Sequence, residues 1–231
     1  MAAADKREGE LTITQKLNEF MQKNRRKIFL GFLAIIVLLV GFIVTITVRD
    51  KMQSKALTRI DAFNSRYEEL KPFIAGEDFE AASRQADITA LLDELAVFAD
   101  KSFGFAAARA YCMSADIYWE QKKWAEAETA WLAAAKSAGK SYLAPVSFFN
   151  AAVAADEQGN TDSAVTLYLR ALNYGDGFPG AVRAQFSVGR LEESRGNKEA
   201  ALQAYRNLVS KWPDDPIWAN LAQSRIMVLS D

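Results

Sequence analysis

The sequence predicts an all-α protein in which one membrane-spanning helix is followed by an α-solenoid of helical hairpins. Three observations lead to this fold class. Residues 28–48 are uncharged and mostly aliphatic, residues 49–231 place apolar side chains at helical spacing without strand-like alternation, and several residue types recur there every 37 positions. With 231 residues, the chain has room for one large domain or two small ones.

The composition argues against catalysis. The chain has no histidine, which excludes a Ser-His-Asp triad, imidazole acid–base chemistry and a His-ligated metal site. The single cysteine, Cys112, permits neither an intrachain disulfide nor a Cys-x-x-Cys motif. A net charge of −1 gives no basic surplus for binding nucleic acid through its phosphates. We therefore expect no enzyme activity, no cofactor, no metal site, no nucleic acid and no small-molecule substrate.

Residues 28–48 predict a transmembrane helix. Of these 21 residues, 16 are Ile, Leu, Val or Phe, and none is charged. Such a helix is about 31 Å long, which is enough to cross a hydrocarbon core of about 30 Å. The run is longer than the core of a cleaved signal peptide, and no small-x-small cleavage site follows it. The sequence thus favours an uncleaved anchor.

The charges around this run predict its orientation. Four basic residues lie between positions 23 and 27, whereas residues 49–51 hold two basic residues and one acidic residue. The excess of positive charge places residues 1–27 in the cytoplasm and residues 49–231 across the membrane. The overall charges agree, because residues 1–27 contain seven basic and four acidic residues and residues 49–231 contain 21 and 25.

The cytoplasmic tail, residues 1–27, allows two interpretations. Thr12 or Thr14 is suited to cap a helix whose apolar side chains share one face. That helix either lies on anionic lipid or binds a cytoplasmic partner, or it is a juxtamembrane extension of the anchor. The apolar positions are Ile13, Leu17, Phe20 and Met21.

A repeat of 37 residues organises the C-terminal domain. Three alanines are each followed, four positions later, by an aromatic residue, and two glycines share the same period. We expect each glycine to end a first helix in a left-handed turn and each alanine to let a second helix approach closely. One hairpin cannot bury its apolar face alone, so successive hairpins must stack. The repeat positions are Ala127, Trp131, Gly159, Ala164, Tyr168, Gly196, Ala201 and Tyr205.

These positions resemble the tetratricopeptide repeat (TPR), in which a turn glycine precedes Ala-x3-aromatic-x2-Ala. The resemblance covers about residues 106–213, and the first repeat departs from it with Lys122 at the turn position. It implies a TPR-like solenoid over residues 49–231. The expected parts are a divergent opening hairpin at 49–105, repeats at 106–142, 143–179 and 180–215, and a capping helix at 216–231.

The resemblance also implies a partner-binding groove on the first helix of each repeat. Its mixture of aromatic, aliphatic and charged residues suits an extended or helical polypeptide. Alternatively, Phe149, Val153 and Phe186 pack inside the superhelix or against the opening hairpin. The carboxylate clamp of chaperone-binding TPRs is not expected, because Cys112 and Asp116 replace its Lys and Asn. The carried-over groove residues are Arg109, Asp116, Trp119, Phe149, Asn150, Asp156, Arg183 and Arg190.

The whole architecture, a basic tail, one anchor and a TPR domain, resembles the ancillary subunits of the bacterial Sec translocon. This resemblance implies a single-pass protein of the bacterial inner membrane with a cytoplasmic N-terminus and a periplasmic TPR domain. The implied partners are proteins: translocon subunits, a periplasmic chaperone and secreted clients. The alternative is a structural scaffold for another envelope complex, in division, wall synthesis or outer-membrane assembly.

Overall fold

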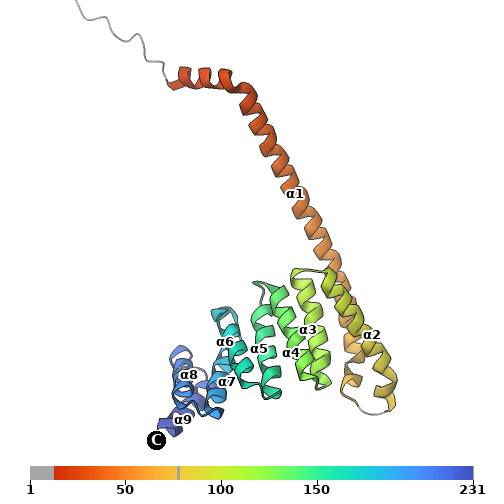
Figure 1. Ribbon diagram of the computed structural model, residues 1–231, viewed down its shortest axis with the longest axis vertical. Coiled ribbons are helices and arrows are strands. Elements are labelled where there is room, and N and C mark those ends of the chain that lie inside the picture. Colours follow the sequence, from red (N-terminus) through yellow and green to blue (C-terminus); the bar gives the residue numbers. More distant parts are fainter. Residues whose placement is uncertain (1–12, 77–78, 231) are drawn as a thin grey trace, which may run out of the picture. The chain divides into compact units, whose positions relative to one another are not determined.

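The structure is a computed structural model that describes residues 13–76 and 79–230, and no strand occurs among them (Figure 1). The chain divides into two compact units, Met1–Ser54 and Lys55–Asp231. An all-α fold is thus confirmed. The helices are α1 (Ile13–Ile74), α2 (Phe79–Lys101), α3 (Gly104–Glu120), α4 (Trp124–Ala138), α5 (Leu143–Glu157), α6 (Thr161–Leu172), the short 3-10 helix η1 (Gly175–Gly177), α7 (Ala181–Ser194), α8 (Lys198–Lys211) and α9 (Trp218–Ser230).

The first unit is the N-terminal part of α1. This helix is long and apolar enough to cross a membrane, by length and composition, and none of its most apolar stretch is buried. The hydroxyls of Thr45 and Thr47 donate to the carbonyls of Gly41 and Ile43 at 2.8 and 2.9 Å, which satisfies them within the helix. Residues 13–27 and the apolar run belong to the same helix, α1, and Thr12, one of the two residues suited to cap the tail helix, lies outside the described residues.

The second unit begins with a hairpin formed by residues 55–74 of α1 and by α2. The two helices are antiparallel, because Phe63 lies 5.4 Å from Phe98, ring centroid to ring centroid, and Arg66 pairs with Glu94 at 2.8 Å. Large aliphatic and aromatic side chains fill their interface, and Ile117 of α3 joins them. Of the turn expected at residues 76–78, positions 77 and 78 lie outside the described residues.

Helices α3 to α8 form three further hairpins with similar turns. Lys122, Gly159 and Gly196 all have left-handed backbone, with φ of 57°, 73° and 75°. The first turn therefore has the conformation that glycine favours, although a lysine occupies it. The repeat alanines Ala127, Ala164 and Ala201 are fully buried, as their period predicted.

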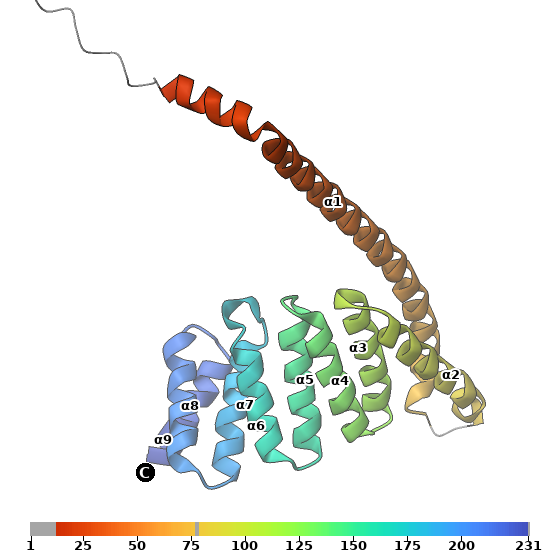
Figure 2. The same ribbon diagram turned by 45° about the horizontal axis from the view of Figure 1, so that its top comes forward.

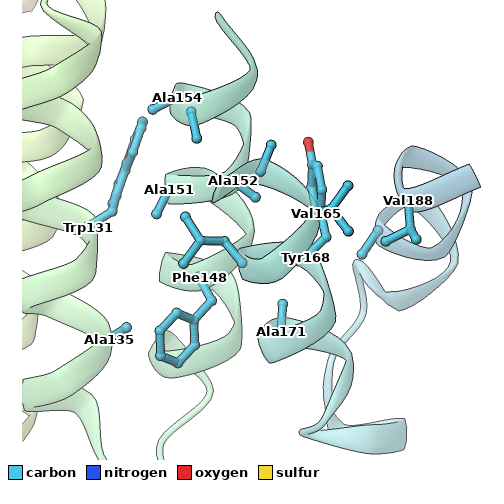
Figure 3. Packing of buried hydrophobic residues seen from close by; sticks show 14 of the residues in the cluster. Trp131, Ala135, Phe148, Ala151, Ala152, Ala154, Val165, Tyr168, Ala171 and Val188 are labelled. Carbon is cyan, nitrogen blue, oxygen red and sulfur yellow. The ribbon is translucent and has the colours of Figure 1, made fainter. Parts of the chain in front are cut away.

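Small residues set the close packing of these hairpins. Figure 3 shows Trp131 of α4 facing α5, and Val165 and Tyr168 of α6 pointing toward Val188 of α7. A Cβ atom placed on Gly189 would lie 2.5 Å from the ring of the buried Tyr205, so only glycine fits there. Alanine and glycine thus bring the backbones together, and one aromatic ring per repeat fills the remaining space.

The last helix, α9, starts two residues later than the sequence suggested. The carboxylate of Asp215 accepts hydrogen bonds from the backbone N–H groups of Ile217 and Trp218 at 3.0 and 2.7 Å. This is an N-terminal cap, so Pro216 precedes the helix instead of opening it. Trp212 and Trp218 pack against the C-terminal core cluster.

Candidate partner-binding surface

The expected groove residues lie on the first helices of successive hairpins. All eight come from α3, α5 and α7, and all eight are at least partly exposed. They are distributed as Arg109, Asp116 and Trp119 on α3, Phe149, Asn150 and Asp156 on α5, and Arg183 and Arg190 on α7.

Helices α5 and α7 bring four of these residues together in two pairs. Arg190 forms an ion pair with Asp156. The guanidinium of Arg183 lies over the ring of Phe149, 5.2 Å from its centroid, in cation–π geometry. These four side chains are therefore held in place by contacts within the protein before any partner binds.

Helices α7, α8 and α9 form a second polar group around Glu193. Its carboxylate accepts from Arg225, with Nε to Oε2 at 3.1 Å, and from the hydroxyl of Tyr205 at 3.1 Å. The hydrogen bond from Arg225 lowers the pKa of Glu193, and burial together with this carboxylate raises the pKa of Tyr205. Phe186 and Arg190 line the same open cleft of about 430 Å³. The cleft combines an aromatic wall with two guanidinium groups.

Asp116 of α3 sits at the seam with the opening hairpin. Burial raises the pKa of this carboxyl to about 6, although Arg109 and Lys71 lower it in part. The indole Nε1 of Trp131 is buried and has no hydrogen-bond partner of normal geometry. It lies near the carboxyl of Asp116 and lowers the pKa of that carboxyl slightly. Asp116 is thus a half-buried acid whose neighbours compensate it incompletely.

The other expected residues serve packing or stand apart. The indole of Trp119 lies 4.6 Å from Trp124 and 5.6 Å from Trp131, centroid to centroid, within the core. Phe149 packs against the central cluster, and Phe186 contacts the rings of Tyr205 and Trp218. The alternative interpretation, in which the apolar groove residues pack inside, therefore describes these side chains, Val153 included.

Cys112 lies next to the groove and is chemically quiet. Its Sγ is 3.6 Å from the hydroxyl of Ser147, and burial raises the pKa of the thiol to about 11. The thiol is therefore protonated at neutral pH, which makes it a poor nucleophile. Among the residues that the structure describes, no group of three or more Cys, Asp or Glu side chains is placed to hold a metal ion.

The sequence reasoning missed Arg225, because α9 was interpreted as a simple cap. A signal for it exists in the spacing of contacts between neighbouring hairpins. Asp156 and Arg190 are 34 positions apart, Glu193 and Arg225 are 32 apart, and Glu128 and Ser163 are 35 apart. Hydrogen-bonding or oppositely charged residues at a separation of 32 to 35 positions are thus candidates to face each other across adjacent hairpins.

Comparisons with known proteins agree with this architecture. Residues 149–216 match the family model described as tetratricopeptide repeat. A TPR repeat-containing protein of Treponema pallidum is 43% identical over 127 residues, which is 55% of this chain and 52% of that protein. The chain thus spans about half the length of this curated relative.

Two solved structures share the fold. Nearly identical TPR-like repeats from a proposed kinesin light chain of Podosopora anserina align with a TM-score of 0.55 at 13% identity, over 74% of this chain and 86% of that one. A point variant of the same repeats gives 0.53 at 12% identity, over 74% and 85%. The domain is therefore a TPR-like solenoid, with the sequence signature of the tetratricopeptide repeat at residues 149–216.

Proposed function

We propose that this chain is a membrane-anchored adaptor that binds proteins at the outer face of the bacterial inner membrane, as an accessory factor of the Sec translocon and of periplasmic chaperones. One observation carries the proposal. A segment of α1 with 21 uncharged residues, all of them exposed except the partly exposed Ile28, ends six residues before the compact unit that holds the TPR-like solenoid. TPR domains bind proteins, and an exposed apolar helix of this length needs a bilayer around it.

The anchor supplies the mechanism. Tethering confines the solenoid to a thin layer at the membrane, which raises its effective concentration toward polypeptides that emerge from a channel there. Arg183, which lies over the partly exposed ring of Phe149, and the cleft around Arg190 offer guanidinium groups beside aromatic rings, and both kinds of group are common anchors of protein interfaces. A client segment with acidic and aromatic side chains has the complementary chemistry.

Crosslinking of the full-length protein in its own membrane tests the proposal. We expect translocon subunits and a periplasmic chaperone among the crosslinked proteins. Replacing residues 28–48 by an unrelated anchor separates contacts made in the bilayer from those made by the solenoid. Absence of every translocon component from both preparations contradicts the accessory role.

A charge reversal locates the contact on the solenoid. Arg183→Glu is expected to reduce crosslinking, because Arg183 is exposed and projects over Phe149. The matched control is Arg206→Glu, which changes another exposed arginine, on α8, and is expected to leave crosslinking unchanged. Equal loss in both variants indicates a nonspecific charge effect instead of a binding surface.

A second function, a structural scaffold for an envelope complex, is favoured by the fixed ion pairs. Asp156 with Arg190 and Glu193 with Arg225 give the surface a set charge pattern, and its apolar residues are partly packed. Such a surface suits one permanent partner better than many clients. A single division, wall-synthesis or outer-membrane-assembly protein in the crosslinking experiment supports this function.

A further inference from the structure

The solenoid has two edges that differ in charge. The inter-repeat edge holds the loops that join α2 to α3, α4 to α5 and α6 to α7; the intra-repeat edge holds the turns that join α3 to α4, α5 to α6 and α7 to α8 (Figure 2). The second helices α2, α4, α6 and α8 each have an acid in the first turn, at the intra-repeat edge. Each has a base in the last turn, at the inter-repeat edge: Lys101, Lys136, Arg170 and Lys211.

The helix dipole does not explain this arrangement. A dipole favours cations at every helix C-terminus, but the first helices α3, α5 and α7 have no base in their last turns. They carry acids there instead, at Glu120, Glu157 and Glu193. Those C-termini lie at the intra-repeat edge, beside the acidic first turns of the second helices. The charges are therefore sorted by edge and not by helix direction.

Residues of the opposite sign weaken the contrast only in part. Arg195 lies at the intra-repeat edge but is paired with Asp162 at 2.6 Å and Glu192 at 3.3 Å. The intra-repeat edge also holds Lys122, Lys123 and Lys198. The inter-repeat edge also holds Asp100, Asp176, Asp214 and Asp215, of which Asp215 caps α9.

Exposed aromatic rings lie at the inter-repeat edge. The side chain of Tyr142 is 60% exposed and that of Tyr174 38%. Each ring is held by a neighbour, since Tyr142 lies 6.0 Å from Phe105 and Tyr174 lies 6.2 Å from Phe148, between centroids. The three turns of the opposite edge, from Glu-Gln-Lys-Lys to Ser-Arg-Gly-Asn, contain no aromatic residue. Tyrosine with lysine and arginine is the composition of protein surfaces at a membrane–water interface.

The chain keeps this edge close to the predicted anchor. The antiparallel contacts of Phe63 with Phe98 and of Arg66 with Glu94 place Lys55, where the second unit begins, level with the end of α2. That end belongs to the inter-repeat edge. Six residues separate Lys55 from residues 28–48, and they span at most about 25 Å even when fully extended. This limit holds for any placement of the two units.

We propose that the inter-repeat edge of the solenoid docks on an anionic bilayer surface. Tyr142 and Tyr174 enter the headgroup region, and Lys101 and Lys140 lie near lipid phosphates. A bilayer fits better than an acidic protein because these residues are spread over the loops of successive hairpins and do not form one compact patch. Docking stands the helices upright on the membrane. The inference rests on the membrane anchor of the proposed function.

The test uses the full-length protein with Cys112→Ala, reconstituted into nanodiscs of phosphatidylcholine with or without phosphatidylglycerol. An environment-sensitive fluorophore is attached at Asn173→Cys, an exposed position of the inter-repeat edge, or at Glu157→Cys on the opposite edge. We expect nitroxide-labelled lipid to quench the probe at position 173 only, and more strongly with phosphatidylglycerol present.

Charge neutralisation gives the size of the effect. Lys101→Gln with Lys140→Gln is expected to lower the ratio of docked to undocked protein about thirtyfold, from the usual contribution of a base near an anionic membrane. The matched control, Lys122→Gln with Lys123→Gln, is expected to leave quenching unchanged because both residues lie at the intra-repeat edge.

The outcomes separate the docked edge from the anchor. Protein that leaves the nanodiscs on alkaline washing contradicts the anchor and with it the proposed function. Protein that stays, but whose probes at positions 173 and 157 are quenched equally or not at all, overturns the docking. Quenching at position 173 that does not increase with phosphatidylglycerol also overturns docking on an anionic surface. If the probe at position 173 is shielded in native membranes but not in nanodiscs, a membrane protein covers the inter-repeat edge, and docking on lipid is overturned.

Discussion

The opening hairpin and the three repeats bury their helices in different ways. Between α1 and α2, large side chains such as Phe63, Leu91 and Leu95 fill the interface. Between the helices of the repeats, fully buried alanines and Gly189 set the distance, and single aromatic rings fill what remains. The first region keeps its helices apart with bulk, whereas the second brings their backbones together.

The difference predicts opposite sensitivities. A core of large residues loses most when a side chain is shortened, because a cavity remains. A core set by alanine and glycine loses most when a side chain is enlarged, because the backbones must separate. The following substitutions test this contrast.

Leu91→Ala is expected to have the largest effect. Leu91 is fully buried between α1, α2 and α3, so its truncation should lower the free energy of unfolding by about 2–5 kcal/mol. Urea denaturation of the full chain in detergent, followed by circular dichroism, measures the loss. The control Leu92→Ala shortens a neighbour that is only partly buried and should cost less. Equal costs at both positions contradict a core that depends on bulk.

Gly189→Ala tests the repeats. The added Cβ would meet the ring of Tyr205, which is buried and has no room to move, so we expect a loss of about 1–3 kcal/mol. The same denaturation measures it. Gly177→Ala is the matched control, because its Cβ meets nothing within 4 Å and its backbone is not left-handed. A neutral Gly189→Ala shows that the helices separate easily and that close approach is not required.

Asp116→Asn tests the seam between the two regions. Because the pKa of Asp116 is raised to about 6, the folded protein binds its proton more tightly than the unfolded chain. Stability therefore falls as the pH rises from about 4 to about 6 and is constant above. The variant lacks this loss and should be more stable at neutral pH, on the order of 1 kcal/mol, but similar near pH 4. Thermal unfolding at both pH values decides, and Glu157→Gln, an exposed acid on α5 that does not act on Asp116, serves as control.

Lys122→Gly is expected to have the smallest effect and to stabilise the protein. Lys122 has a φ of 57°, a conformation that is unfavourable for a residue with a Cβ, so glycine should add about 0.5–1 kcal/mol. Gly159→Ala, at the equivalent turn, should cost about the same amount. A rise in melting temperature for the first and a fall for the second are expected. If Lys122→Gly destabilises the protein, the lysine side chain stabilises the fold by more than its left-handed backbone destabilises it.

The repeats could be predicted from the sequence because their packing requires the same residue types at a fixed interval. Ala127, Ala164 and Ala201 are all fully buried, and the glycines predicted at the turns have left-handed backbone. A close approach of two helices admits few residue types, so the same types recur at the same interval. The core of large side chains in the opening hairpin tolerates many residue types. The sequence therefore indicates its helices only through the spacing of apolar residues.

The candidate surface was less predictable. Family positions identified Asp156 and Arg190, but not that each is the other's partner. Arg225 was missed because its role depends on α9 lying against α7, which helical periodicity does not encode. The pKa of Asp116 likewise depends on burial and on the charge of Lys71 in the opening hairpin, a residue distant from it in sequence. Properties that arise between hairpins require the stacked structure.

The order in which the helices touch has a consequence for how the protein folds. The main contacts run from each helix to the next along the chain, from α2 to α9. Folding then requires few distant encounters, so we expect it to be fast and to progress hairpin by hairpin. A solenoid whose N-terminal end crosses a membrane first would complete its opening hairpin while later repeats are still in transit. The completed part would give each arriving hairpin a surface on which to fold.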